Sequence, residues 1–480
     1  MSQKDIFIWH DYETWGICPK KDRIAQFAAI ITDLELNIID KPINAYCKIP
    51  SDYLPKIEAI SVTGLSPQLV NNKGLSEHLF AKDIYNLMIS PNSCSIGYNS
   101  LRFDDEFTRN LFYRNFMDPY EREWSNGNSR WDLIDLVRSC YAFRPEIMNW
   151  HYVDGKVSVK LEDVAKVNNL QHTDAHNAIS DVEATIDLAR MIKAKNPKIF
   201  DYYYDLRLKT NVLNLIDFEE NTPLLHVSGM FGADRKFTSF IAPFSYHPIN
   251  KNAVITIDLT KDVSPILNLS VEEIRERLYS TKEELSNKGL IPIPIKLVHV
   301  NKSPMLVNQK ALDANLEQRL NINKADALNN LEQLRAVDGL VTKLQEVFDV
   351  SYQDDSADSE DADISKADEM LYDGFFSNAD RAKIKAITNS TNINQALLDV
   401  TFQDARLNEM LFLFKARNYP ELLSVGELAA WNDYCGSKFD FVEYLSHIES
   451  FLSHSDCVGL SFDAVRDLIE LVSGRSDVEL

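Results

Sequence analysis

Near its start the chain runs from apolar residues straight into two acids. Residues 6–9 are apolar and β-favouring, and Asp11 and Glu13 follow at a spacing of two. Because side chains alternate between the two faces of a strand, these two carboxylates point to one side while Tyr12 points away. We therefore predict a strand over residues 6–14 that ends in a pair of metal-binding carboxylates.

The spacing of two acids is weak support for a metal site by itself. The same pattern recurs at Asp33, Asp217 and Asp477, each followed by Glu two positions later. In a chain this acidic, such pairs also occur by chance. The prediction therefore depends on partners elsewhere in the sequence.

Two further acids supply those partners. Asp104 opens a predicted helix directly after a short predicted strand, and Asp181 follows His176 by five positions. Residues five apart in a helix are rotated by roughly 140°, so His176 and Asp181 would not share one helix face. We therefore expect His176 in the loop before a helix and Asp181 in the first turn of that helix.

Four carboxylates from three segments, with a histidine nearby, are the components of two-metal phosphodiester hydrolysis. Oxygen ligands hold two Mg²⁺ or Mn²⁺ ions about 3.5–4 Å apart, one activating water and one stabilising the leaving 3′-oxygen. His176, with an ordinary pKa near 6.5, is suited to accept the proton of that water. Taken singly, Asp104 and Asp181 could be charges that favour a helix start, and His176 a surface residue. Their joint order favours a catalytic site.

Composition limits the class of protein. The 480 residues are 45% hydrophobic, which is typical of a globular protein of two to four domains, and we find neither a membrane-spanning run nor a secretory signal. The six cysteines form no C-x-x-C pair, which argues against a zinc site and a disulfide framework. The net charge of −22 is concentrated in residues 351–480. We expect a soluble, cytoplasmic monomer.

The periodicity of apolar residues predicts the order of the elements. Residues 1–200 read as strands over 6–14, 23–33 and 38–49, followed by helices that alternate with a short strand, which predicts an α/β domain with a mixed sheet. Residues 201–350 read as a β-rich domain. Residues 351–369 read as an acidic linker, with 354–369 too polar to bury, and residues 370–480 as an all-α domain.

The order Asp11-x-Glu13, Asp104, His176-x4-Asp181 resembles the DEDDh family of 3′→5′ exonucleases. Longer motifs resemble, more closely, the bacterial exodeoxyribonuclease I family. These motifs lie at residues 10–14, 102–110, 128–133, 226–233 and 372–381. Residues 421–480 carry no motif that we assign to this family.

The resemblance implies both a fold and an activity. The fold would be an RNase H-like exonuclease domain over 1–200, an SH3-like β-rich domain over 201–350 and an all-α C-terminal domain over 370–480. The activity would be Mg²⁺-dependent, processive release of 5′-mononucleotides from the 3′ ends of single-stranded DNA, in DNA repair and recombination. The acidic C-terminal tail of single-stranded DNA-binding protein would be a partner.

Binding of single-stranded DNA needs aromatic stacking platforms together with phosphate donors. Both kinds of residue occur near the predicted metal ligands. We expect Trp131, although aromatic, to be a core residue and not a DNA contact. The predicted DNA contacts are Arg102, Phe103, Arg109, Tyr113, Arg114, Trp124, Arg130 and Lys160. Arg144, followed by Pro145, is a candidate to bind the carboxylate of the partner's tail, because a guanidinium can donate two parallel hydrogen bonds to a carboxylate.

Two other readings remain open from the sequence. A DEDDh exoribonuclease of the small-RNA-trimming type is generally one domain and would leave residues 201–480 unexplained. A non-catalytic binding scaffold has no need of four converging negative charges beside phosphates, so the intact acids argue against it.

Overall fold

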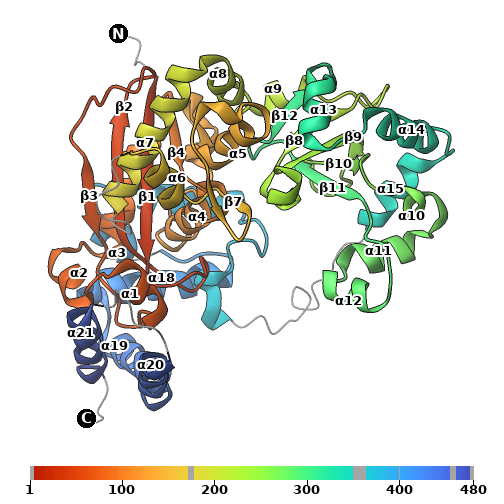
Figure 1. The fold of residues 1–480 in the computed structure, drawn as a ribbon. Helices are drawn as coiled ribbons and strands as arrows, with labels where there is room; N and C mark the ends of the chain where they lie inside the picture. The colour runs from red at the N-terminus through yellow and green to blue at the C-terminus, as the bar shows by residue number, and fades with distance from the viewer. Residues whose placement is uncertain (1–4, 171–177, 350–363, 399, 455–460, 476–480) are drawn as a thin grey trace. The chain divides into compact units, whose positions relative to one another are not determined.

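The computed structural model describes residues 5–170, 178–349, 364–398, 400–454 and 461–475 (Figure 1). The chain forms two compact units. The first comprises Met1–Ser129, Gln171–Ile186 and Asp355–Leu480, and the second comprises Arg130–Leu170 and Asp187–Asp354. The C-terminal segment therefore belongs to the same compact unit as the N-terminal segment. Among the described helices, none is both long and apolar enough to cross a membrane.

A mixed five-stranded sheet begins the fold, in the order β3-β2-β1-β4-β5. Its strands are β1 (Ile6–Thr14), β2 (Ile24–Thr32), β3 (Ile43–Tyr46), β4 (Ser93–Gly97) and β5 (Ser129–Asp132). β2 runs antiparallel to β1 and to β3, whereas β4 runs parallel to β1. The mixed sheet predicted from the sequence is confirmed.

The parallel pairing of β1 and β4 is short, and this shortness creates the site described below. Only residues 6–9 of β1 pair with β4, while pairing with β2 continues to the end of β1. Residues 10–14 therefore extend past the carboxyl end of β4 with one edge open. In sheets of this kind, ligands bind beyond the carboxyl ends of the parallel strands.

Helices and 3₁₀ turns complete the first unit. The helices are α1 (Ile57–Thr63), α2 (Pro67–Lys73), α3 (Glu77–Met88), α4 (Asp104–Arg114), the first half of α7 (Ala178–Lys195), α16 (Asn378–Thr388), α17 (Ile393–Leu398), α18 (Ala405–Asn418), α19 (Val425–Ser437), α20 (Phe441–His454) and α21 (Phe462–Ser473). The 3₁₀ turns are η1 (Ser100–Arg102), η2 (Glu121–Glu123), η3 (Ser125–Gly127), η8 (Ile364–Glu369) and η9 (Pro420–Leu422).

The C-terminal helices share hydrophobic cores with the N-terminal segment. Trp15 and Ile57 pack in one cluster with Ile448 and Leu468, and a second cluster joins Phe116 to several residues beyond position 366. Burial of these side chains stabilises the unit by about 1.5–3 kcal/mol each. A fragment ending near residue 197 would expose both clusters to water.

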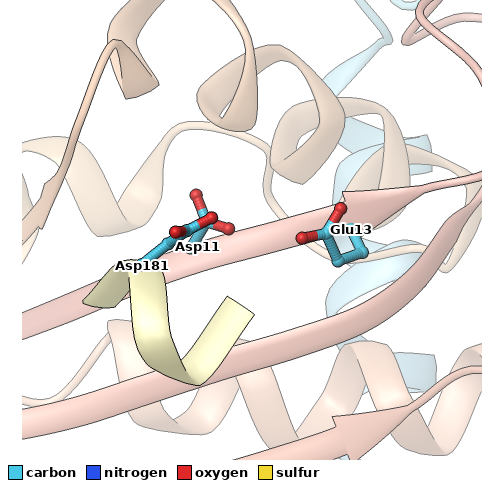
Figure 2. A group of neighbouring side chains, drawn as sticks. All are labelled: Asp11, Glu13 and Asp181. Atoms are coloured by element: carbon cyan, nitrogen blue, oxygen red, sulfur yellow. The ribbon is translucent and has the colours of Figure 1, made fainter. Parts of the chain in front are cut away.

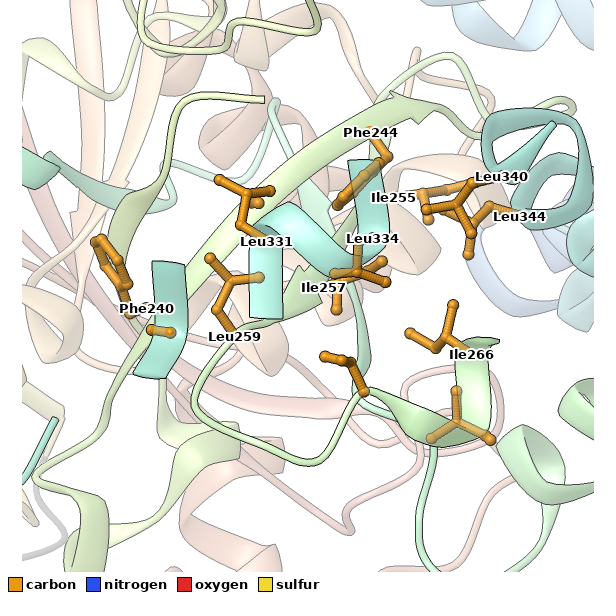
Figure 3. Close-up of a cluster of buried hydrophobic side chains, with 14 of the residues drawn as sticks. Phe240, Phe244, Ile255, Ile257, Leu259, Ile266, Leu331, Leu334, Leu340 and Leu344 are labelled. Atoms are coloured by element: carbon orange, nitrogen blue, oxygen red, sulfur yellow. The ribbon is translucent and has the colours of Figure 1, made fainter. Parts of the chain in front are cut away.

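The second unit is built around a separate five-stranded antiparallel sheet in the order β11-β10-β9-β8-β12. Its strands are β8 (Leu224–Val227), β9 (Thr238–Tyr246), β10 (Ala253–Asp258), β11 (Ile295–His299) and β12 (Met305–Asn308). Every residue of β10 is buried, and its Ile255 and Ile257 pack with Leu334 and Leu344 from the covering helices (Figure 3). The β-rich domain predicted from the sequence is confirmed.

The remaining elements of this unit surround the sheet or precede it in sequence. They are α5 (Leu133–Phe143), β6 (His151–Val153), β7 (Lys156–Ser158), α6 (Leu161–Val167), the rest of α7, α8 (Pro197–Asp205), α9 (Lys209–Leu213), α10 (Ser264–Asn268), α11 (Val271–Tyr279), α12 (Lys282–Asn287), α13 (Ala314–Leu320), α14 (Lys324–Arg335) and α15 (Leu340–Phe348), with 3₁₀ turns η4 (Pro145–Ile147), η5 (Gly229–Phe231), η6 (Ala233–Arg235) and η7 (Gln309–Ala311).

Two local predictions are wrong. The strand predicted over residues 38–49 is reduced to β3, because Pro42 lacks a backbone donor, and before it Ile38 makes only an isolated bridge. The expectation that 354–369 is too polar to bury fails at its end. Residues 350–363 lie outside the described residues, but η8 follows them and its Ala367 and Asp368 are buried.

Candidate metal centre

The predicted carboxylates lie where β1 extends past β4. Along this open edge, the backbone N–H of Tyr12 donates a 3.2 Å hydrogen bond to Oδ1 of Asp104, the first residue of α4. The hydroxyl of Thr108, one turn further along α4, donates to the Asp104 carbonyl oxygen at 2.8 Å and lies 3.0 Å from the Tyr12 hydroxyl. These bonds fix the start of α4 against the end of β1.

Three carboxylates converge at this point (Figure 2). Asp11 and Glu13 from β1 and Asp181 from the first turn of α7 each offer an oxygen, and the three oxygens lie within 4.8 Å of one another. We call Asp11, Glu13 and Asp181 the carboxylate group. Two of the three acids come from alternate positions of one strand, as the period of a strand requires.

The electrostatics of the group show that these acids repel one another. Burial, together with the charges of Asp104, Glu13 and Asp181, raises the pKa of Asp11 well above its ordinary value. Burial and the charges of Asp181 and Asp104 raise the pKa of Glu13 to about 8. Asp104 is therefore close enough to act electrostatically on the group, and it is buried, with 4% of its surface exposed.

A buried ion pair lies behind the carboxylate group. The Arg122 guanidinium, fully buried, contacts Oδ1 of Asp105 at 2.5 Å. Burial, then the charge of Arg122, lowers the pKa of the neighbouring His10 to about 4. His10 is therefore a neutral core residue, although it precedes Asp11 in sequence.

The predicted general base cannot be placed. His176 lies in residues 171–177, outside the described residues. Helix α7 is described from Ala178 and Asp181 is in its first turn, as expected. His176 therefore lies two positions before the first described residue of that helix.

Models of three protein families match the chain. The family described as exonuclease matches residues 8–189, the exonuclease I SH3-like domain matches 207–350, and the exonuclease I C-terminal domain matches 365–458. Exodeoxyribonuclease I of Escherichia coli K12 is 45% identical over 430 residues, covering 89% of both chains. The chain belongs to the exodeoxyribonuclease I family. The resemblance inferred from the motifs is thus confirmed.

Solved structures of this family agree with the fold. The zinc-bound form of E. coli exonuclease I with single-stranded DNA has a TM-score of 0.89 at 42% identity, covering 98% of this chain and 99% of that chain. The structure of SSB/exonuclease I in complex with the inhibitor CFAM has a TM-score of 0.87 at 40% identity, covering 99% and 100%. Exonucleases of this family require divalent metal ions.

Among the residues predicted to contact DNA, four are accessible. Arg102 is exposed and Phe103, which precedes Asp104, is partly exposed. Trp124 keeps 69% of its surface exposed, and the Lys160 side chain keeps 74%. These four residues of this exodeoxyribonuclease I family member stay predicted DNA contacts.

Two other predicted DNA contacts, both on α4, are buried in the protein. Tyr113 is 4% exposed and its hydroxyl donates to the Ala367 carbonyl oxygen. Arg114 is 2% exposed and its guanidinium pairs with Glu77 at 3.0 Å. The sequence placed these aromatic and basic residues near the metal ligands, but they lie on the side of the helix that packs inside the protein.

Arg109 and Arg130, also predicted DNA contacts, are buried as well. Arg109 is 5% exposed and is held by Glu106 and Glu123 at 2.6 and 2.8 Å. Arg130 is also 5% exposed, and one guanidinium nitrogen donates to the Asn301 carbonyl oxygen. The expectation that Trp131 is a core residue is confirmed, since it is fully buried.

Sequence reasoning missed a cavity beside the metal centre. A cavity of about 830 Å³ is lined by Glu13 and Phe103, and also by residues of α1 and α20. Helix α1 was not predicted, because its seven residues give too short a window for a helical period. Tyr444 and His447, the residues of α20 that line the cavity, carry no signal that would link them to a site more than 400 residues away in sequence.

Proposed function

We propose that this chain hydrolyses single-stranded DNA from the 3′ end and releases 5′-mononucleotides in a reaction that depends on two Mg²⁺ ions. The observation that carries the proposal is the convergence of the carboxylate group, with pKa values raised by burial and mutual repulsion. Perturbed carboxylates of this kind cluster at functional sites. Membership of the exodeoxyribonuclease I family supports the substrate.

The residues present fit a hard divalent cation. The carboxylate group offers oxygen donors alone, which suit Mg²⁺ or Mn²⁺, whereas zinc sites usually include nitrogen or sulfur. A cation among these oxygens would relieve the repulsion that raises the pKa values of Asp11 and Glu13. We assign Asp11, Glu13, Asp104 and Asp181 as the residues that hold the two ions.

Bound metal would supply a nucleophilic water at neutral pH and stabilise the departing oxygen. The protein groups do the rest. Asp11 and Glu13 would hold the metal ions from alternate positions of one strand, so that the ions could bind the scissile phosphate. His176 takes the proton of the attacking water. Arg102, Phe103, Trp124 and Lys160 hold the strand by phosphate contact and stacking.

A labelled-oligonucleotide assay tests this function. The substrates are one single-stranded and one double-stranded DNA, each labelled at the 5′ or the 3′ end, plus a single-stranded RNA of the same sequence. We expect immediate release of the 3′ label as a mononucleotide from single-stranded DNA in Mg²⁺, and none in a chelator. Preferential cleavage of RNA, or release of the 5′ label first, would refute the proposal.

Substitution of His176 separates proton transfer from binding. His176→Ala should lower the hydrolysis rate by about 10²–10⁴-fold, the usual contribution of a general base. Affinity for DNA in Ca²⁺ buffer should stay unchanged, and the pH-rate profile should lose its lower limb. His151→Ala, a partly exposed histidine on β6, serves as the matched control. Survival of the lower limb in His176→Ala would assign water activation to another group.

We also propose a partner for the second unit. Arg144 is exposed at the end of α5, and its guanidinium donates to the neighbouring Phe143 carbonyl oxygen at 2.7 Å. A guanidinium in this position can grip the terminal carboxylate of the acidic tail of single-stranded DNA-binding protein. The solved structure of SSB/exonuclease I supports such a partner. Arg144→Ala should weaken binding of a labelled tail peptide, whereas Arg466→Ala, exposed on α21, should not.

A further inference from the structure

The first turn of α4 carries Asp104, and its position depends on contacts other than a helix cap. Phe103, the residue before the helix, has an apolar side chain that cannot accept a hydrogen bond from the backbone of the first turn. Tyr12 holds this turn from the side of β1, through Asp104 and through Thr108. A buried ion pair provides a second attachment.

Asp105 and Arg122 form this ion pair. Successive residues of a helix are rotated by about 100°, so Asp104 and Asp105 point in different directions. Asp105 is 1% exposed and accepts a 2.5 Å hydrogen bond from Nη2 of Arg122, which is fully buried. Among the described residues, Nε and Nη1 of Arg122 have no hydrogen-bond partner. This guanidinium therefore acts on the fold chiefly through Asp105.

Arg122 is itself held in place by both of its neighbours in the 3₁₀ turn η2. The Glu123 carboxylate accepts hydrogen bonds at 2.8 and 3.2 Å from Nε and Nη2 of Arg109 on α4. The Tyr85 hydroxyl of α3 donates to the Glu121 carboxylate at 2.5 Å. Because η2 is attached to two helices, Arg122 is a fixed point against which the start of α4 is set.

The charge of Arg122 also acts on the end of β1. Burial raises the pKa of the Tyr12 hydroxyl, whereas the charge of Arg122 opposes this rise and that of Asp104 adds to it. Tyr12 lies between Asp11 and Glu13 in sequence, on the opposite face of the strand. Arg122 and Asp104 are therefore both close to Tyr12, the residue whose N–H binds Asp104.

We propose that Arg122 is a positioning residue for the metal ligand Asp104, and that it acts through Asp105. The bond between Arg122 and Asp105 fixes the rotation of the first turn of α4, and with it the direction in which the Asp104 carboxylate points. This inference rests on the proposed function, which assigns Asp104 to the two metal ions. Substitution of a residue that orients a metal ligand without touching the metal typically lowers metal affinity or activity by about 10- to 100-fold.

The test measures Mg²⁺ binding and hydrolysis with the full-length protein. Arg122→Met removes the guanidinium and keeps an unbranched side chain. The apparent dissociation constant of Mg²⁺, from the rise in melting temperature without DNA, should increase by about 10- to 100-fold. The Mg²⁺ concentration for half-maximal hydrolysis should increase in the same proportion, whereas kcat at saturating Mg²⁺ should fall by a smaller factor. Arg122→Lys keeps a positive charge beside Asp105 and should recover part of the Mg²⁺ affinity.

Arg114→Met is the matched control. Arg114 lies at the opposite end of α4, and its guanidinium pairs with Glu77 at 3.0 Å. The side chains of Arg114 and Arg122 are both fully buried, and among the described residues Nε and Nη1 have no hydrogen-bond partner in either of them. Arg114→Met should lower the melting temperature and leave the affinity for Mg²⁺ unchanged. An equal loss of Mg²⁺ affinity in Arg114→Met and Arg122→Met would overturn the proposal, because loss of stability alone would then explain it.

A double substitution tests the action through Asp105. Asp105→Asn removes the charge of the acceptor and keeps its shape, so it should weaken Mg²⁺ binding about as much as Arg122→Met does. The double variant should bind Mg²⁺ no more weakly than either single variant, because both substitutions break the same interaction. Losses that multiply would show that Arg122 does not act through Asp105. If Arg122→Met does not fold, Arg122→Lys takes its place in this comparison.

The outcomes separate this inference from the proposed function. Asp104→Ala should lose most of the rise in melting temperature that Mg²⁺ gives. Mg²⁺ binding by Asp104→Ala equal to that of the unaltered protein would refute the ligand assignment in the proposed function. If Asp104→Ala loses Mg²⁺ binding while Arg122→Met and Asp105→Asn keep it, the positioning role alone is refuted.

Discussion

The first unit contains two buried clusters of charge that differ in one respect. The carboxylate group contains acids alone. The second cluster, which we call the ion-pair cluster, contains both acids and bases. Its members are Arg23, Asp52, Glu77, Arg114, Asp368 and Arg417. Both clusters join segments far apart in the sequence.

The acids of the two clusters shift in opposite directions. Burial alone would raise the pKa of Asp52, but Arg417, 2.6 Å away, holds the pKa of Asp52 well below its usual range. Asp368 is likewise buried, and Arg417 and Arg23 lower its pKa. In the carboxylate group burial acts in the same direction, but the neighbours are acids, so the pKa of Glu13 rises to about 8.

This difference separates a structural use of charge from a functional one. The ion-pair cluster provides its own counterions and joins η8 and α18 to the sheet and to α3. The carboxylate group consists of acids whose oxygen atoms could together hold a metal ion. Neighbouring buried carboxylates with raised pKa values are typical of functional sites.

The largest effect is expected from substitutions in the carboxylate group. Asp11→Ala, Asp104→Ala or Asp181→Ala should abolish Mg²⁺-dependent hydrolysis, by more than about 10³-fold, because several kcal/mol of charge stabilisation are lost with the metal. Thermal stability without metal should stay equal or rise, since repulsion is relieved. Asp83→Ala, exposed on α3, is the control. Near-normal turnover at saturating Mg²⁺ in any of the three variants would refute the ligand assignment.

The next largest effect is expected from a substitution that removes one base from the ion-pair cluster. Arg417→Ala leaves Asp52 and Asp368 without their nearest base and should lower the free energy of unfolding by about 3–5 kcal/mol. Denaturant titration measures this loss, with Arg466→Ala on the surface of α21 as the control. At a temperature where Arg417→Ala stays folded, its kcat should match that of the unaltered protein. A selective loss of kcat without a loss of stability would contradict the separation of the two clusters.

Addition of Mg²⁺ should stabilise the folded protein through the carboxylate group and not through the ion-pair cluster. Mg²⁺ at 100 times its dissociation constant should stabilise the folded protein by about 2.7 kcal/mol, because it binds the folded state. Thermal melting with and without Mg²⁺ measures this gain. Arg417→Ala should show the same gain, and Asp11→Ala should show much less. An equal gain in Asp11→Ala would place the bound Mg²⁺ outside the carboxylate group.

The smallest effect is a dependence of stability on pH. Asp52, Glu77 and Asp368 have lowered pKa values in the folded protein, so the unfolded chain binds more protons in acid. Their stabilisation is present above about pH 4.5 and is lost as the pH falls through the folded pKa values. Arg417→Ala should therefore show a shallower loss of stability below pH 4.5 than the unaltered protein. Parallel pH profiles would show that the cluster does not contribute.

Local patterns predicted much of the fold because the signals are local. The apolar run before Asp11 predicted β1, and the acids at Asp104 predicted the start of α4, since alternation and helix-start charges act over a few residues. The short helix α1 escaped prediction. The buried end of the acidic segment was also missed, because Asp368 pairs with Arg23 and Arg417, which are distant from it in the sequence.

The sequence by itself determined the acids of the proposed metal centre, their order and the family, because these depend on residue identity and spacing. Only the tertiary structure decided which charged residues face solvent. Arg109 and Arg114 read as DNA contacts, yet each is buried against acids from other segments. The tertiary structure also places α20 at the cavity beside Glu13. The burial and pairing of a side chain depend on which distant segments pack together. The periodicity of a helix or strand shows which face is apolar but not which segment packs against it.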